Sequence, residues 1–282
     1  MNYRHAFHAG NFADVLKHTV LALALKRMTE KPKPLRVIDT HAGIGTYRLD
    51  SPEAQRTGEW IGGIGRLLGP GAEPLPAPVD ALLAPYLDAV RTLNPDGELR
   101  VYPGSPVLAL ALLRPEDRLI ASELHPEDVE LLRQALRGDR RAKVLALDGW
   151  QAIRALLPPK ERRGLILVDP PFEEAGELDR LVAGLADGLR RFATGTYMLW
   201  LPIKDQRQVA AFEQALKQLA SGKLLWVELR TAPTAPEGPL TATAVVVANP
   251  PYGLAESFSA LLPILAERLA VAPGGGWALR EI

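Results

Sequence analysis

Two short stretches of the chain place a polar residue before two prolines and an aromatic ring. Asp169-Pro170-Pro171-Phe172 ends one apolar run, and Asn249-Pro250-Pro251-Tyr252 ends another. Carboxylate and carbonyl oxygens accept hydrogen bonds, and proline adds no competing N–H donor. The pattern therefore places hydrogen-bond acceptors beside an aromatic ring, an arrangement that could form a reaction centre. The elements around the two stretches must decide which one is the reaction centre.

Polar residues also end three other apolar runs that we expect to be strands. These residues are Asp39, His41, Gly43 and Gly45 in the first run, Glu123 in the second, and Asp148-Gly149 in the third. Glycine lets the backbone approach a ligand closely, and an acid after the second strand can accept hydrogen bonds from a ribose. The glycine pattern alone is weak, because the third glycine of the dinucleotide fingerprint is absent. Each carboxylate alone could merely cap a helix, but four polar strand ends on one edge predict a ligand site.

The apolar runs alternate with helical patterns along most of the chain. Strands are predicted at 35–43, 118–125, 142–150, 163–171, 195–202, 223–231 and 240–248. Helices are predicted at 127–137, 174–191 and 205–221. This alternation indicates an α/β fold, in which a mostly parallel sheet is covered by helices on both faces. We expect seven strands, of which one is antiparallel.

The loop between the last two predicted strands separates the two proline motifs. It spans only residues 232–239, whereas a parallel connection needs roughly a dozen residues or more. The last strand should therefore be antiparallel, and 249–252 should leave the sheet at the edge opposite 169–172. Ligands bind outside the carboxyl ends of parallel strands. We therefore place the reaction centre at 169–172 and interpret 249–252 as a rigid strand exit.

A long stretch, 46–117, separates the first two predicted strands. Ser51-Pro52-Glu53 is a good helix start, and 79–93 has a helical pattern. Ser105 is a plausible N-cap before Pro106, so 106–114 should be the crossover helix that returns to the sheet. We predict a single domain over 1–282, in which residues 47–97 form a small helical insertion.

Composition excludes several classes of protein. The 282 residues are 47% hydrophobic and 23% charged, which is typical of a soluble globular chain, and there is no cysteine. Disulfides, thiolate metal sites and a cysteine nucleophile are therefore excluded. The N-terminus lacks the apolar core of a secretory signal, and no run is long enough to span a bilayer, so we expect a cytoplasmic protein without a membrane segment.

The formal net charge is zero, whereas a protein that binds nucleic acid usually has a basic excess. Any basic footprint must therefore be local. The candidates are the runs 140–143, 160–163 and 190–191. Each of them, taken alone, is more often a solvated helix end or loop.

The constellation resembles the class I S-adenosylmethionine-dependent methyltransferases, in which a tetrapeptide (D/N)-P-P-(F/Y/W) marks enzymes that methylate planar amino groups. Five segments resemble more specifically the RlmJ-type 23S rRNA adenine-N6 methyltransferases, over nearly the whole chain. They are residues 3–18, "DTHAGIG" (39–45), "YPGSP" (102–106), "DPPF" (169–172) and "RRFATGTY" (190–197). The resemblance implies a Rossmann-like fold with a small helical insertion, and we expect a monomer that acts on 23S rRNA.

The resemblance also implies roles for individual residues. Asp169 would be catalytic, together with Pro170 and Phe172, and residues 1–20 would contribute to the active site. S-adenosylmethionine would be bound by His18, His41, Gly43, Ser105, Glu123, Asp148, Gly149 and Asp169. Tyr3 and Phe172 would face the RNA. Phe172 departs from the tyrosine that is common at this position, and it retains the stacking face without the hydroxyl.

Other functions are compared with this interpretation. A nicotinamide-dependent oxidoreductase leaves the Asp-Pro-Pro-Phe turn unexplained. Methylation of guanine N2 or of a glutamine amide is nearer, but those sites more often carry Asn in the tetrapeptide. A non-catalytic RNA-binding relative would be expected to have lost the acid or the glycines. No metal is expected, because His5, His8 and His18 match no standard zinc spacing.

Overall fold

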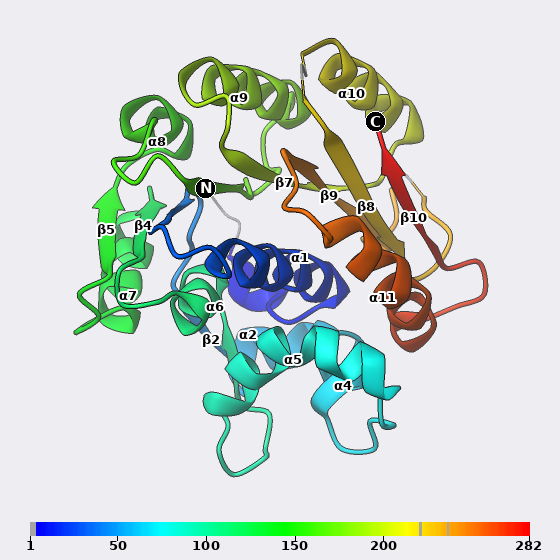
Figure 1. Cartoon of the computed structure of the whole chain (residues 1–282). Coiled ribbons are helices and arrows are strands. Elements are labelled where there is room, and N and C mark those ends of the chain that lie inside the picture. Colours follow the sequence, from blue (N-terminus) through cyan, green and yellow to red (C-terminus); the bar gives the residue numbers. More distant parts are fainter. Residues whose placement is uncertain (1–3, 220–221, 236) are drawn as a thin grey trace.

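The computed structural model describes residues 4–219, 222–235 and 237–282. Its main sheet has eight strands in the order β10-β8-β9-β7-β6-β1-β4-β5 (Figure 1). Their bounds are β1 Arg36–Asp39, β4 Arg118–Glu123, β5 Ala142–Ala146, β6 Gly164–Val168, β7 Thr196–Pro202, β8 Leu224–Arg230, β9 Ala242–Ala248 and β10 Gly276–Glu281. All seven predicted strands are present, so the α/β fold with a mostly parallel sheet is confirmed.

The prediction of seven strands was wrong by one. β10 pairs antiparallel with β8 at the edge of the sheet, so two strands rather than one are antiparallel. The residues of β10 are only half-buried or exposed and include Arg280 and Glu281. An edge strand of this kind has no continuous apolar run to reveal it in the sequence.

β9 is antiparallel to both of its neighbours, β7 and β8. β9 therefore ends beside the starts of β7 and β8, where Ala248 pairs with Tyr197 and Leu224. This confirms that the turns 169–172 and 249–252 leave the sheet at opposite edges.

Helices cover both faces of the sheet (Figure 1). One core lies between the sheet and α1 Phe12–Thr29, α5 Ala77–Thr92, α6 Ser105–Leu112, α7 Pro126–Ala135 and α11 Leu254–Leu269. The other lies between the sheet and α8 Gly149–Leu156, α9 Glu177–Arg191 and α10 Gln206–Leu219. None of the described helices combines the length and the apolarity that crossing a bilayer requires.

Sequence patterning also missed three longer helices, α1, α8 and α11, and the reason is clearest for α1. Every residue from Phe12 to Leu25 is buried, so no polar face marks the helical period. The helix begins at Asn11, whose side chain accepts hydrogen bonds from the backbone N–H groups of Ala13 and Asp14. A short 3-10 helix, η1 His5–Phe7, precedes it.

The stretch between β1 and β4 consists mainly of helices. Strands β2 Thr46–Arg48 and β3 Val101–Pro103 pair with each other. Between them lie α2 Pro52–Thr57, α3 Glu59–Gly62, α4 Gly65–Leu68 and α5. Leu83 and Tyr86 of α5 belong to the same core as Leu16 of α1. That 47–97 forms a distinct insertion stays a prediction.

Candidate active site

The carboxyl ends of the parallel strands surround a cavity of about 470 Å³, which we call the inner pocket. Its lining includes every residue that the sequence assigned to cofactor binding, although they come from six different segments. These residues are His18, His41, Gly43, Ser105, Glu123, Asp148, Gly149 and Asp169. Tyr3 lies outside the described residues.

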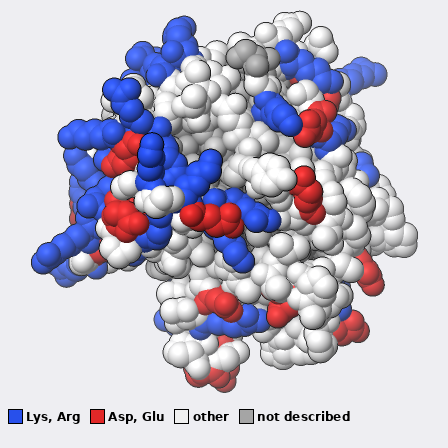
Figure 2. All heavy atoms as spheres, in the orientation of Figure 1, with Lys and Arg blue, Asp and Glu red and all other residues white. Residues whose placement is uncertain are grey.

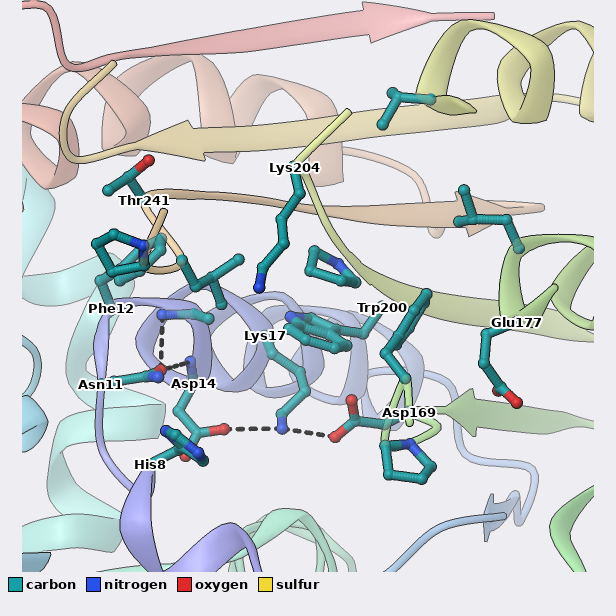
Figure 3. A pocket seen from close by; sticks show the side chains of 18 of the residues that line it. His8, Asn11, Phe12, Asp14, Lys17, Asp169, Glu177, Trp200, Lys204 and Thr241 are labelled. Carbon is teal, nitrogen blue, oxygen red and sulfur yellow. Dashed lines mark hydrogen bonds and ion pairs between the residues drawn. The ribbon is translucent and has the colours of Figure 1, made fainter. Parts of the chain in front are cut away.

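A second cavity of about 1230 Å³, the outer cleft, shares several lining residues with the inner pocket. Figure 3 shows residues that line the outer cleft. Phe172, Trp200 and Lys204 line the outer cleft, and Asp169 and Lys17 line both cavities. The carboxylate of the Asp-Pro-Pro-Phe turn therefore lies on the wall that the two cavities share.

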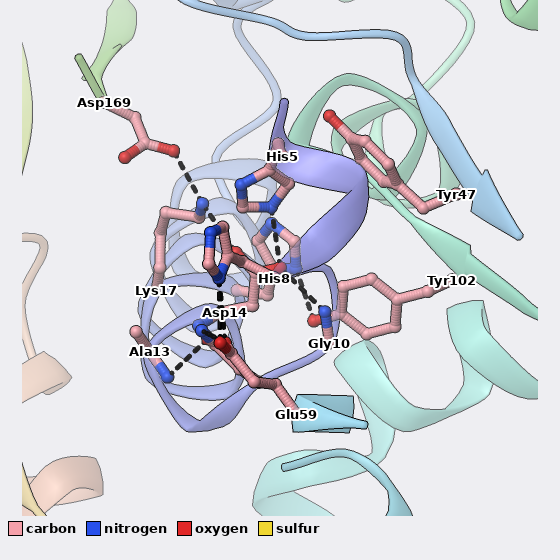
Figure 4. A network of polar contacts seen from close by, with 12 residues as sticks. His5, His8, Gly10, Ala13, Asp14, Lys17, Tyr47, Glu59, Tyr102 and Asp169 are labelled. Carbon is pink, nitrogen blue, oxygen red and sulfur yellow. Dashed lines mark hydrogen bonds and ion pairs between the residues drawn. The ribbon is translucent and has the colours of Figure 1, made fainter. Parts of the chain in front are cut away.

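Asp169 is held by a buried ion-pair network (Figure 4). Lys17 Nζ lies 2.6 Å from Asp169 Oδ2 and 2.7 Å from Asp14 Oδ1. Asp14 Oδ2 in turn lies 2.9 Å from His5 Nε2 and accepts the backbone N–H of Gly10 at the same distance. Lys17 and Asp14 are almost fully buried, so the network fixes the position of the Asp169 carboxylate.

Electrostatics keep Lys17 and Asp14 ionised. Burial opposes the charged forms, but the charges of Asp14 and Asp169 outweigh it and raise the pKa of Lys17 well above its ordinary value. Burial likewise opposes the Asp14 carboxylate, but His5 and Lys17 hold the pKa of Asp14 well below its ordinary value. A buried cation between two carboxylates is stable only as a paired set.

A second buried carboxyl group lies at the end of β1. Ser105 Oγ donates to Asp39 Oδ2 at 2.6 Å, and Asp39 Oδ1 has no hydrogen-bond partner among the described residues. Burial raises the pKa of Asp39 to about 7. Ser105 is therefore oriented by Asp39. The sequence analysis named Asp39 as a polar strand end and Ser105 as a cofactor residue, but it did not predict that the two are in contact.

Glu123 and Asp148 are both bound to the backbone. Glu123 Oε2 accepts the N–H of Gly43 at 2.9 Å, and its Oε1 accepts those of Leu124 and His125. Asp148 is the N-cap of α8 and accepts the N–H of Gln151 at 2.9 Å. Helix capping is therefore part of what Asp148 does, while Glu123 fixes the glycine loop after β1.

Close packing explains the glycine that follows Asp148. A Cβ at Gly149 would lie 2.5 Å from both the His41 ring and the Thr40 carbonyl oxygen. His41 Nδ1 is 2.8 Å from Thr40 Oγ1, and burial lowers the pKa of His41 to about 4. A larger residue at 149 would displace this neutral ring from the pocket wall.

His18 is also neutral. Its Nδ1 lies 2.7 Å from the Tyr102 hydroxyl, which is 2.9 Å from that of Tyr86. Burial lowers the pKa of His18 to about 3.

His8, by contrast, lies 2.9 Å from Glu59 Oε1, a hydrogen bond that raises the pKa of His8. The described residues include no group of three or more His, Asp or Glu side chains that could hold a metal.

The wall of the outer cleft contains two side chains that the sequence analysis missed, Lys17 and Trp200. Phe172 meets the Trp200 ring edge-to-face at 5.5 Å between centroids, and Lys17 Nζ lies 5.9 Å from that ring. Trp200 stands near the carboxyl end of β7, so the reasoning applied to the other strand ends would have found it. Lys17 lies inside the segment 3–18, but nothing in its spacing indicated a contact with residue 169.

The 249–252 turn is a structural corner. Asn249 Nδ2 donates to the carbonyls of Ala193 and Gly195, each at 2.8 Å, and the Asn249 carbonyl accepts from Thr196 Oγ1. Asn249 has a φ of 51°, and the Tyr252 side chain is 94% exposed. The side chain of Asn249 therefore fastens β9 to the start of β7, as expected for a strand exit.

Comparisons with known proteins give a consistent result. The family described as "Ribosomal RNA large subunit methyltransferase D, RlmJ" matches residues 32–281. The chain is 44% identical over 275 residues to the Escherichia coli protein "Ribosomal RNA large subunit methyltransferase J", covering 98% of this chain and 96% of that protein. It is 41% identical to the protein of the same name from Haemophilus influenzae, covering 100% and 99%.

A solved structure is also similar. A crystal structure of a Legionella pneumophila protein superposes with a TM-score of 0.88 at 32% identity, covering 97% of this chain and 98% of that one.

Proposed function

Because the chain belongs to the RlmJ family of ribosomal RNA large subunit methyltransferases, we propose that it methylates the N6 amino group of an adenine in 23S rRNA, with S-adenosylmethionine as methyl donor. The observation that carries the proposal is the position of Asp169 on the wall shared by the inner pocket and the outer cleft. A donor in one cavity and a base in the other would meet at this carboxylate.

The inner pocket fits a nucleoside-containing cofactor. Its volume of about 470 Å³ lies in the usual range for small-molecule sites. The buried, unpartnered Asp39 Oδ1 offers an acceptor beside Ser105. The loop at Gly43 would hold the amino-acid end, Glu123 the ribose, and Asp148 the adenine, with His18, His41 and Gly149 closing the walls. When bound, S-adenosylmethionine supplies an electrophilic methyl group.

The chain's own residues would activate the target amino group. An adenine amino nitrogen is a poor nucleophile, because its lone pair is delocalised into the ring. Asp169 and the Pro170 carbonyl can accept its two protons in hydrogen bonds and so localise the lone pair. Lys17 contacts only Oδ2 of Asp169, and no described residue forms a hydrogen bond to Oδ1. Oδ1 can therefore accept a hydrogen bond from the amino group. Positioning of the two substrates and preorganised electrostatics would provide most of the rate acceleration of methyl transfer.

The outer cleft would hold the flipped base. Phe172 and Trp200 offer aromatic surface for it, and a base must leave its helix to reach such a site. Segments from both the N-terminus and the helical stretch line the cleft, including His5, His8 and Glu59. We therefore propose that residues 1–20, with Tyr3, and the insertion 47–97 shape the RNA entrance. One chain forms both cavities, which supports a monomer. The proposed substrate, 23S rRNA, implies that the protein acts in the cytoplasm.

The test measures methyl transfer from labelled S-adenosylmethionine to protein-free 23S rRNA. Label in N6-methyladenosine, lost in Asp169→Ala and kept in Asn249→Ala, is the expected result. If the label appeared in N2-methylguanine instead, the substrate would be a guanine rather than an adenine. Cofactor binding without transfer to any RNA would overturn the proposal and point to another amino group, such as a glutamine amide.

A further inference from the structure

Basic segments converge on the edge of the sheet opposite the inner pocket. The run 140–143, extended here to 137–143 to include Arg137, leads into β5. The runs 160–163 and 190–191 precede β6 and β7, and the segments 30–36 and 114–118 lead into β1 and β4. These five strands are neighbours and run parallel. Their starts therefore lie at one edge, where three runs that are ordinary when taken singly become a single surface.

Hydrogen bonds join these segments. Arg114 donates to the carbonyls of Lys31 and Lys33, at 2.8 and 3.1 Å, and Arg163 also donates to the Lys33 carbonyl. The pKa of Arg163 lies below its ordinary value because of its burial and the neighbouring positive charge of Arg114. The buried Asp117 pairs with Arg114 at 2.9 Å and offsets part of this repulsion. The fold therefore holds three of the basic segments together here.

We call this region the amino-edge surface and define it by its exposed cations and one exposed ring. Its members are Lys31, Lys33, Arg118, Arg137, Arg140, Lys143, Lys160, Arg162, Arg190, Arg191 and Tyr252. Figure 2 shows Lys and Arg gathered on the side of the molecule that carries α7, β5 and α8.

Charge is unevenly divided between the two edges. The five basic segments contain 14 of the 33 Lys and Arg residues but only five of the 33 Asp and Glu residues. The rest of the chain is therefore acidic overall. The outer cleft follows this trend, since Glu174, Glu177, Asp179 and Asp205 line it. Phosphates would be repelled at that rim, whereas a base that donates amino protons would not.

Helix dipoles explain only part of this distribution. Cations are favoured at helix C-termini, which accounts for Arg190 and Arg191 at the end of α9. Lys31, Lys160 and Arg162 lie outside the helices, and Arg162 has a φ of 51°. Their accumulation at the same edge needs another explanation.

Tyr252 adds an aromatic ring to this edge. Asn249 ties the 249–252 turn to Ala193 and Gly195, which lie two and four residues after Arg191. The Tyr252 side chain is 94% exposed. Exposed aromatic rings beside cations are typical of surfaces that bind single-stranded nucleic acid.

We propose that the amino-edge surface is a second RNA-binding site, which takes the phosphate backbone of the RNA whose target base enters the outer cleft. This inference rests on the proposed RNA substrate. In a chain of zero net charge, affinity for RNA must come from a local basic surface. The strands between the two edges have four to seven residues, so roughly 15–25 Å separates the edges, a span that a large folded RNA covers.

The test removes four charges with the substitutions Arg137→Gln, Arg140→Gln, Lys143→Gln and Lys160→Gln. Among the described residues none of the four forms an ion pair, so folding should be retained. We expect the Kd for protein-free 23S rRNA, measured directly, to rise about 10-fold or more at physiological salt. The slope of log K against log salt concentration should become shallower by about 3, since each lost phosphate contact contributes roughly 0.7–0.9. S-adenosylmethionine affinity and kcat at saturating RNA should not change.

A charge-conserving variant at the same four positions is the control: Arg137→Lys, Arg140→Lys, Lys143→Arg and Lys160→Arg. It should bind RNA with the wild-type salt dependence. Tyr252→Ala should weaken RNA binding about 5-fold or more, and Tyr252→Phe should not, because stacking needs only the ring.

Unchanged RNA affinity and salt slope in the glutamine variant would overturn the inference and leave an acidic protein as the partner of this surface. Binding and methylation are measured separately. RNA binding that depends on the surface, without any methylation, would therefore sink the proposed function and leave this inference intact.

Discussion

The turns 169–172 and 249–252 share a residue pattern but use their polar side chains in opposite ways. Asn249 donates both amide hydrogens to backbone carbonyls of its own fold. Asp169 pairs with Lys17 through Oδ2, and Figure 3 shows its second oxygen turned away from Lys17. The Asn249 side chain uses its amide hydrogens in bonds to the backbone before β7. The Asp169 side chain keeps one oxygen available as an acceptor at a cavity wall. A reaction centre is therefore distinguished by hydrogen-bonding capacity that the fold leaves unused.

The largest expected difference between the turns is in catalysis. Asp169→Asn keeps the shape of the side chain but removes its charge, so kcat should fall about 100-fold or more. Asn249→Ala should leave kcat, measured per folded molecule, within a few-fold of wild type. Single-turnover methylation of 23S rRNA measures both variants, and equal losses would abolish the functional distinction between the turns.

The Asp169 turn should also depend on its buried ion pair for stability. Lys17→Met leaves Asp14 and Asp169 without their shared cation, and breaking such a pair costs about 3–5 kcal/mol. The matched control is Lys204→Met, which also alters a lysine of the outer cleft. Lys204 has no ion pair among the described residues, so its loss should change the free energy of unfolding by less than about 0.5 kcal/mol. Urea denaturation of the two variants measures the difference.

Asn249 of the 249–252 turn should contribute to stability alone. Asn249→Ala removes two hydrogen bonds at a position with positive φ, so the free energy of unfolding should fall by about 1–3 kcal/mol. Thr196→Val, which removes only the bond to the Asn249 carbonyl, should cost less. A stable Asn249→Ala protein with low activity would contradict the assignment.

The stability of the two regions that contain the turns should also differ in its dependence on pH. The pKa of Asp39, behind the catalytic turn, is raised to about 7 in the folded protein, against about 3.9 when unfolded. The protonated Asp39 carboxyl group therefore contributes stability that is fully present below about pH 4 and is lost as pH rises through 7. The stability of wild type relative to Asp39→Asn should decline over that interval. Asn249→Ala should differ from wild type by a constant amount, and thermal melts from pH 4 to 8 test both.

The smallest effect concerns the aromatic residue of the catalytic turn. Phe172→Ala should raise the KM for RNA about 5-fold or more, because stacking is worth roughly 1–3 kcal/mol. Phe172→Tyr restores the residue that is common at this position and should change KM less than about 2-fold. A large gain in kcat with tyrosine would assign a role to the hydroxyl.

Local sequence determined seven of the eight strands of the main sheet, the polar residues at their ends and the opposite exits of the two proline turns. Strand runs, strand-end carboxylates and an eight-residue loop that is too short for a parallel crossover are all readable within short windows. β10 was missed because an exposed edge strand has no apolar run, and α1 because a fully buried helix has no polar face.

Only the tertiary structure decided which side chains meet across long separations in the chain. Lys17 and Asp169 are 152 residues apart, and Ser105 and Asp39 are 66 apart. No periodicity records such pairs, because they form only when α1 and α6 pack against the carboxyl ends of β6 and β1. The same holds for the amino-edge surface, since parallel strand order alone turns scattered basic runs into one patch.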